Sequence, residues 1–200
     1  YSVEQTIDAE TAEGYIRILA NPESGLSPLA VTLAIRGTFS IGNSVVSYSG
    51  PEPVEFLDNG VDRYPIRLTA QGIYYLTAEV TDSYSNTHTD TVAVLAQNAS
   101  ELNALLQAKW NGMKAGMLAG DIETALSYIT SNKQGMYAFN FNLLQDHLAE
   151  MEAGMQELTL VQSHDGMAEC TMVGEQNGQQ YSFYVVFEKD SDGIWRIRFF

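Results

Sequence analysis

The stretch Ala96-Gln97-Asn98-Ala99-Ser100-Glu101-Leu102 divides the sequence into two parts with different hydrophobic periods. Before it, apolar residues recur at every second position, which is typical of strands. After it they recur every three or four positions, which is typical of helices. Asn98-Ala99-Ser100-Glu101 fits a capping box, in which the Asn98 side chain accepts from a free backbone amide and Glu101 reaches back to the cap. A helix is therefore predicted to begin here.

This division predicts two domains, since 200 residues suffice for two units of about 100 residues each. We expect a lead-in or linker over residues 1–13, an all-β sandwich over 14–97 and an α+β domain over 98–200. The chain begins at Tyr1 without a basic, apolar leader. It is therefore expected to be a mature form or, preferably, a segment of a longer polypeptide.

Charge and composition limit the partners. The formal net charge is −15 and is shared between the two halves, so neither half would approach a phosphate backbone unaided, and no nucleic acid is expected. No apolar run approaches the length that spans a bilayer, so no membrane insertion is expected. Cys170 is the single cysteine, which rules out an intrachain disulfide.

The first half shows short strands separated by turn formers. Asn21 to Pro28 is rich in turn-forming residues and predicts a loop. Leu29, Val31, Leu33 and Ile35 then alternate with smaller or polar residues, as a half-buried strand does. Gly72-Ile73-Tyr74 fits a corner at which the tyrosine hydroxyl bonds backbone upstream. Repeated short strands of this kind predict an antiparallel sandwich.

Four motifs of this half resemble the polycystic-kidney-disease-type (PKD) immunoglobulin-like domain, over roughly Ile16 to Ala96. They are Asn21-Pro22-Glu23-Ser24-Gly25 with Pro28-Leu29-Ala30-Val31, then Gly72-Ile73-Tyr74, Glu79-Val80-Thr81-Asp82-Ser83 and Thr89-Asp90-Thr91-Val92-Ala93-Val94. The resemblance implies a spacer or adhesive module of an extracellular protein.

No metal or cofactor is predicted. Asp82 and Asp90, with Glu79, could supply oxygens for Ca²⁺, but a dense acidic loop is lacking, and we expect Asp82 to cap a turn instead. His88 and His164 have no companion at ligand spacing.

The second half combines three helical stripes with four strands. The apolar stripes are Leu106, Trp110, Met113 and Met117; then Ile122, Ala125, Leu126 and Ile129; then Tyr137, Phe141, Leu144, Leu148, Met151 and Met155. Gly120 is predicted to end the first helix and Asp121 to start the second. Strands follow near residues 157–163, 167–175, 180–188 and 194–200. Three helices on an antiparallel sheet make an α+β unit.

This half resembles the nuclear transport factor 2-like superfamily. The resemblance is carried by Trp110 and Met113, by Leu118-Ala119-Gly120-Asp121-Ile122-Glu123-Thr124-Ala125-Leu126, and by Val185 to Asp190 with Gly193-Ile194-Trp195-Arg196-Ile197. It implies a cone-shaped sheet whose hollow is closed by three helices. The fold class expected for the whole chain is thus an immunoglobulin-like sandwich followed by such a cone.

Alternation along the last strand predicts what the hollow contains. Trp195, Ile197 and Phe199 should face the helices, while Arg196 and Arg198 face away. The residues expected to line the pocket are apolar or weakly polar: Trp110, Met113, Tyr137, Phe141, Cys170, Met172, Phe183 and Trp195. No carboxylate, histidine or lysine lies on the inferred inner face, so no catalytic residue is predicted.

Three functions follow as hypotheses. The leading one is a non-catalytic extracellular or cell-envelope module of a bacterial secreted or surface protein, with a spacer and a domain that binds a small apolar ligand or a protein. The second is an enzyme of isomerase, dehydratase or hydrolase type acting on a small apolar substrate, and the third a purely structural role. The outer sheet face, with Arg196, Arg198 and Glu169, either meets the first domain or a second copy, as in a homodimer, or is solvated.

Overall fold

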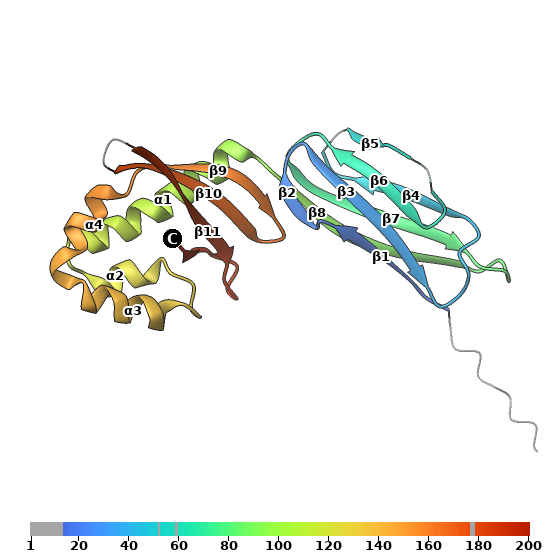
Figure 1. Cartoon of the computed structure of the whole chain (residues 1–200). Coiled ribbons are helices and arrows are strands. Elements are labelled where there is room, and N and C mark those ends of the chain that lie inside the picture. The colour runs from blue at the N-terminus through green and yellow to red at the C-terminus, as the bar shows by residue number, and fades with distance from the viewer. Residues whose placement is uncertain (1–13, 52, 59, 177–178) are drawn as a thin grey trace, which may run out of the picture.

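Twelve strands, four α-helices and one short 3₁₀ helix are present in the computed structural model, which describes residues 14–51, 53–58, 60–176 and 179–200 (Figure 1). The first half contains β1 (Ile16–Asn21), β2 (Ser24–Leu26), β3 (Leu29–Gly37), β4 (Ser44–Ser49), β5 (Val54–Phe56), β6 (Arg63–Leu68), β7 (Gly72–Thr81) and β8 (Thr87–Gln97). The second contains α1 (Ala99–Leu118), α2 (Ile122–Ser127), α3 (Gln134–Leu143), η1 (Gln145–His147), α4 (Leu148–Gly154), β9 (Leu158–His164), β10 (Met167–Gln176), β11 (Gln179–Lys189) and β12 (Trp195–Phe199). The predicted lead-in over residues 1–13 lies outside the described residues.

The first half consists of two sheets with apolar side chains between them. A four-stranded sheet, β1-β3-β6-β5, packs on β8, β7 and β4. The alternation predicted for residues 29–35 is confirmed, because the inward members of β3 are buried: Leu29, Val31, Leu33 and Ile35. The predicted corner is also confirmed, since buried Tyr74 donates its hydroxyl hydrogen to the Ala70 carbonyl at 2.9 Å.

A three-residue strand joins the two halves into one sheet. β2 pairs in parallel with β8, from Ser24↔Leu95 to Leu26↔Gln97, and Gly25 pairs with His164 of β9. The product is an eight-stranded mixed sheet, β12-β11-β10-β9-β2-β8-β7-β4, that runs through both halves (Figure 1).

The predicted fold class is therefore wrong. The chain is mostly β, its larger sheet is mixed rather than antiparallel and is shared by both halves, and four α-helices rather than three occur among the described residues. The prediction failed at β2 because three residues among turn formers are too few to show an alternating pattern.

The start of the helical region agrees with the sequence. Asn98 Oδ1 accepts from the backbone N–H groups of Ser100 (2.8 Å) and Glu101 (3.1 Å), which caps α1. At the other end Gly120 adopts a φ of +67°, which suits glycine just past a helix end. Asp121 then caps α2 by accepting from the Thr124 N–H at 3.0 Å.

The third predicted helix is broken into α3, η1 and α4. Its backbone leaves the helical region at Leu144, where φ is −105° and ψ is 19°. No glycine or proline marks this break, so the hydrophobic pattern predicts one continuous helix here. Tyr137, Phe141, Leu148 and Met155 remain buried on the same side despite the break.

The helices pack on one face of β9–β12, where the core of the second half lies (Figure 1). Trp195 and Ile197 are buried there, as predicted, and Arg196 and Arg198 face away. The inward position predicted for Phe199 is wrong. A register shift between Val186 and Phe187 leaves Phe199 exposed and turns Phe200 toward the helices.

Candidate binding surface

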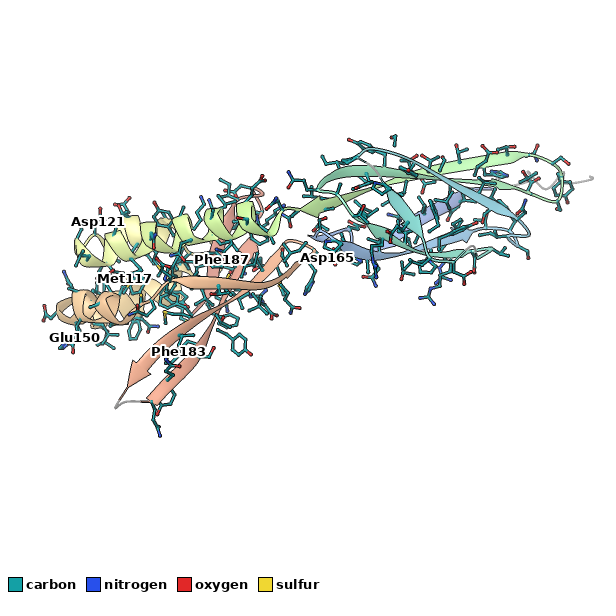
Figure 2. The ribbon with its side chains drawn as sticks, turned by 90° about the horizontal axis from the view of Figure 1, so that it is seen from above. Met117, Asp121, Glu150, Asp165, Phe183 and Phe187 are labelled. Carbon is teal, nitrogen blue, oxygen red and sulfur yellow. The ribbon has the colours of Figure 1, made fainter. Side chains whose placement is uncertain are left out.

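Seven of the eight residues predicted to line a pocket belong to the packed core of the second half or contact it. Six are buried: Trp110, Met113, Tyr137, Phe141, Cys170 and Trp195. Met172 is partly buried against them. Phe183 is 48 % exposed, because it lies on the part of β11 that projects past the helices (Figure 2). Trp195 also borders a groove of about 330 Å³ between the halves, next to Leu105 of α1.

Phe200 occupies the space that the sequence predicts to be hollow. Its ring packs edge-to-face on Trp110, with centroids 5.3 Å apart, and stacks on Tyr137 at 5.1 Å. Its N–H donates to the Tyr137 hydroxyl (3.1 Å), and the Trp110 indole N–H donates to the Gln156 carbonyl (2.9 Å). Trp110 and Tyr137, two of the predicted lining residues, therefore contact the Phe200 ring, and Tyr137 also packs on Phe141. Sequence reasoning missed Phe200 because strict alternation places it on the outer face.

Two buried titratable side chains, Cys170 and Tyr137, lie in this core, and both are neutral at pH 7. Burial raises the pKa of the Cys170 thiol to about 12 and also raises the pKa of the Tyr137 hydroxyl. A cysteine acts as a nucleophile only as its thiolate. In the folded chain neither group is in the ionised form that a nucleophile or general base requires.

The opposite side of the same sheet carries an apolar strip, which we call the outer face: exposed Val173, Tyr184 and Phe199, together with buried Val186. Tyr184 pairs with Thr171, two residues from Val173, and Phe199 pairs with Val186, so all four side chains point away from the helices. Tyr184 is 62 %, Val173 53 % and Phe199 46 % exposed. A groove of about 650 Å³ adjoins the strip at Thr159 and Val173. Exposed aromatic and aliphatic groups that adjoin one another are typical of a protein contact.

A network of ion pairs borders the outer face at the β11–β12 turn. The Arg196 guanidinium donates to both oxygens of Asp192 (2.8 and 2.7 Å) and to Asp190 (3.3 Å). Asp190 also accepts from the Ser131 N–H at 2.8 Å, which ties the turn to the α2–α3 connection. Hydrogen bonds from Arg196 and from the Ile194 N–H lower the pKa of Asp192 from 3.8 to about 2.

This lowered pKa predicts an acid-dependent loss of stability. The Asp192 carboxylate stabilises the fold fully above its ordinary pKa of 3.8, and its contribution disappears as pH falls through the folded value of about 2. Asp192→Asn should therefore unfold at a lower urea concentration than the native chain near pH 6, and the two midpoints should converge as pH falls from 4 towards 2. Midpoints that differ equally at every pH would contradict the assignment.

Asp165 fastens the second half to the first at β2. Its Oδ1 accepts from the backbone N–H groups of Glu23 (2.8 Å) and Ser24 (3.2 Å), and its own N–H donates to the Ser24 carbonyl (3.1 Å). Figure 2 places Asp165 where the two halves meet. A groove of about 480 Å³, with Ile73 and Leu95 in its lining, lies beside this contact.

Asp82 has the turn-capping role predicted for it. Its Oδ1 accepts from the N–H groups of Tyr84 (2.8 Å) and Asn86 (2.9 Å), and its Oδ2 lies 3.0 Å from His88 Nε2. The hydrogen bond with His88 is the main reason that the pKa of Asp82 lies well below its usual range. Within the described ranges, no three His, Cys, Asp or Glu side chains come together as ligands of one metal ion would.

Comparison with known proteins found no related family. No family model matches the sequence, and no curated protein is significantly similar to it. Of the helices in the described residues, none combines the length and apolar character needed to cross a bilayer.

Proposed function

We propose that this chain is a non-catalytic, protein-binding module of a bacterial secreted or cell-envelope polypeptide. The outer face is the observation that carries the proposal, because Tyr184, Val173 and Phe199 are exposed together on a rigid sheet. Phe200 packs on Trp110 and Tyr137, two of the residues expected to line a pocket for a small apolar ligand, which favours a protein as the partner. A second copy of the chain is one partner that this face admits.

In this proposal the first half acts as a spacer. The sheet shared through β2 supports that role, since backbone pairing on both sides of Gly25 resists bending at the joint. The extracellular location is supported by the resemblance of Asn21 to Gly25 and Gly72 to Tyr74 to polycystic-kidney-disease-type domains, which serve as spacers in extracellular proteins.

An isomerase, dehydratase or hydrolase acting on a small apolar substrate is the alternative. Such an enzyme needs an acid, base or nucleophile in a pocket that substrate can enter. The core geometry supports this alternative less well, because Cys170 and Tyr137 are neutral and packed.

A photoreactive aromatic residue in place of Tyr184 tests the proposal in cells that produce the chain. We expect one discrete cross-linked product, whose mass identifies either a second copy or another protein. The same residue in place of Tyr84, which is 86 % exposed in the β7–β8 turn, is the matched control and should give none. Equal cross-linking at both positions, or none at 184, would contradict binding through the outer face.

The spacer role predicts that Asp165 stiffens the joint. Asp165 adopts a φ of +46°, a region that glycine and asparagine tolerate. Asp165→Gly removes the acceptor without backbone strain, so the amides of Glu23 and Ser24 should exchange faster and solution scattering should show a wider range of shapes. Asp165→Asn keeps an acceptor oxygen and should resemble the native chain. If Asp165→Gly changed neither measurement, the side-chain contact would not stiffen the joint.

A further inference from the structure

Three of the four strands at the ends of the two sheets have their free edge covered or shortened. The edge of β12 is covered by backbone, since the Ile197 N–H donates to the Tyr128 carbonyl (2.8 Å) and the Thr130 N–H donates to the Ile197 carbonyl (2.9 Å). On β1 the Ile18 N–H donates to the Asp90 carboxylate of β8 (2.8 Å). β5 has only three residues, and Glu55 lies at its centre. These are the usual means by which sheet edges avoid pairing with other chains.

The fourth terminal strand, β4, has none of these protections. Its sequence Ser44-Val45-Val46-Ser47-Tyr48-Ser49 contains no charged residue and no proline, and all six residues pair with β7 without a register shift. At its first residue, the Tyr64 hydroxyl donates to the Ser44 carbonyl (2.9 Å). Among the described residues, no hydrogen bond from outside β7 reaches positions 45–49. Val45 is nevertheless 59 % and Tyr48 37 % exposed.

A groove whose described lining residues are uncharged lies beside this edge. It has a volume of about 520 Å³ and is lined by Asn43, Ser44, Val45, Val46, Phe56, Gly60, Val61 and Tyr64. A partner selected by positive charge would find no carboxylate among the described residues of this lining. The groove therefore suits a neutral, extended strand that places an apolar side chain between the two sheets.

We propose that the occupant of this edge is the β4 strand of a second copy, added antiparallel about a two-fold axis at Ser47. In this register each Val46 lies opposite Tyr48 of the partner copy, on the side that faces the groove, because Val46 pairs with inward-facing Ala78 of β7. Aromatic and β-branched residues form favourable cross-strand pairs. The pairing is self-complementary, as a two-fold interface must be, and it goes beyond the proposed function because it uses a different half of the chain from the outer face.

The net charge of −15 predicts how the stability of this dimer changes with salt concentration. Two such chains repel one another, so contact is favoured where neither copy places a carboxylate. Screening the remaining charge should therefore strengthen pairing as salt is raised. An interface held by ion pairs would weaken instead.

Sedimentation equilibrium on the native chain tests the pairing. We expect a concentration-dependent dimer of twice the 22.0 kDa chain mass, more populated at high salt. Ser47→Lys places two lysines opposite one another and should weaken the dimer by at least about tenfold. The thermal unfolding midpoint of the dilute monomer should stay unchanged, since residue 47 is exposed. An equimolar mixture of Ser47→Lys and Ser47→Glu should restore dimers.

Cysteine substitution tests the register. Directly opposed residues of an antiparallel pair lie about 4.5–5.5 Å apart at Cα, within the range of a disulfide, so Ser47→Cys should cross-link readily on oxidation. Ser49→Cys, on the same strand and face, lies more than about 13 Å from its symmetry mate and should not. Native Cys170 is buried and does not compete. A chain that stays monomeric up to near-millimolar concentration, a dimer that Ser47→Lys leaves intact, or equal cross-linking at 47 and 49 would each overturn the proposal.

Discussion

Replacing Trp110 by alanine is expected to lower the free energy of unfolding by about 3–5 kcal/mol, the range for large aromatic truncations in a packed core. Trp110 is fully buried and packs against Phe200, so its loss leaves a cavity that the rigid sheet below cannot close. It also removes the donor to the Gln156 carbonyl. Urea unfolding followed by the fluorescence of Trp195, the other tryptophan, measures the change.

Trp110→Phe is the matched control for this prediction. Phenylalanine keeps most of the ring contact with Phe200 but cannot donate to the Gln156 carbonyl. The loss should therefore fall to about 1–3 kcal/mol, the usual penalty for a buried polar group left without its partner together with a small cavity. If Trp110→Ala unfolded at the native midpoint, the interior would not be the packed core described above.

Local signals in the sequence predicted the local structure well. The Asn98 cap, the Tyr74 corner and the inward position of Trp195 each depend on residues within a few positions of one another, and each is confirmed. The joint between the halves depends instead on a contact between segments more than 100 residues apart. Gly25 meets β9 so closely that an added Cβ would lie 3.1 Å from the Ser163 carbonyl oxygen and 2.6 Å from Leu29 Cδ1. In the sequence Gly25 is simply one more turn former.

The candidate surface was missed for a related reason. Residues 181–187 read Tyr-Ser-Phe-Tyr-Val-Val-Phe, with apolar side chains at both even and odd positions near the end of the run. The prediction placed Phe183 and Phe187 on the inward face of the strand. Tyr184 and Val186 then fell on the outward face, and no role was assigned to them. In the structure Tyr184 is the most exposed residue of the outer face, whereas Phe183 lies on the part of β11 that projects past the helices. Adjacent apolar residues of opposite parity indicate that both faces of a strand have a surface to cover.

Gly116→Ala is expected to destabilise the chain by about 1–3 kcal/mol, as overpacking of a tight core does. In most exposed helical positions this change gains up to about 1 kcal/mol. Gly116 differs because α1 crosses α2 there: an added Cβ would lie 2.6 Å from the Ala125 backbone nitrogen and 2.9 Å from its Cα. Backbone atoms cannot rotate away as a flexible side chain can, so the two helices must separate.

Gly135→Ala in α3 makes the same chemical change where an added Cβ would meet nothing within 4 Å. It should raise the free energy of unfolding by up to about 1 kcal/mol. Urea midpoints of the two variants, measured against the native chain, should therefore move in opposite directions. Because helix propensity contributes with the same sign to both, a difference in sign isolates the contact of Gly116 with Ala125. Stabilisation by both substitutions would mean that α2 packs on α1 less closely than the structure shows.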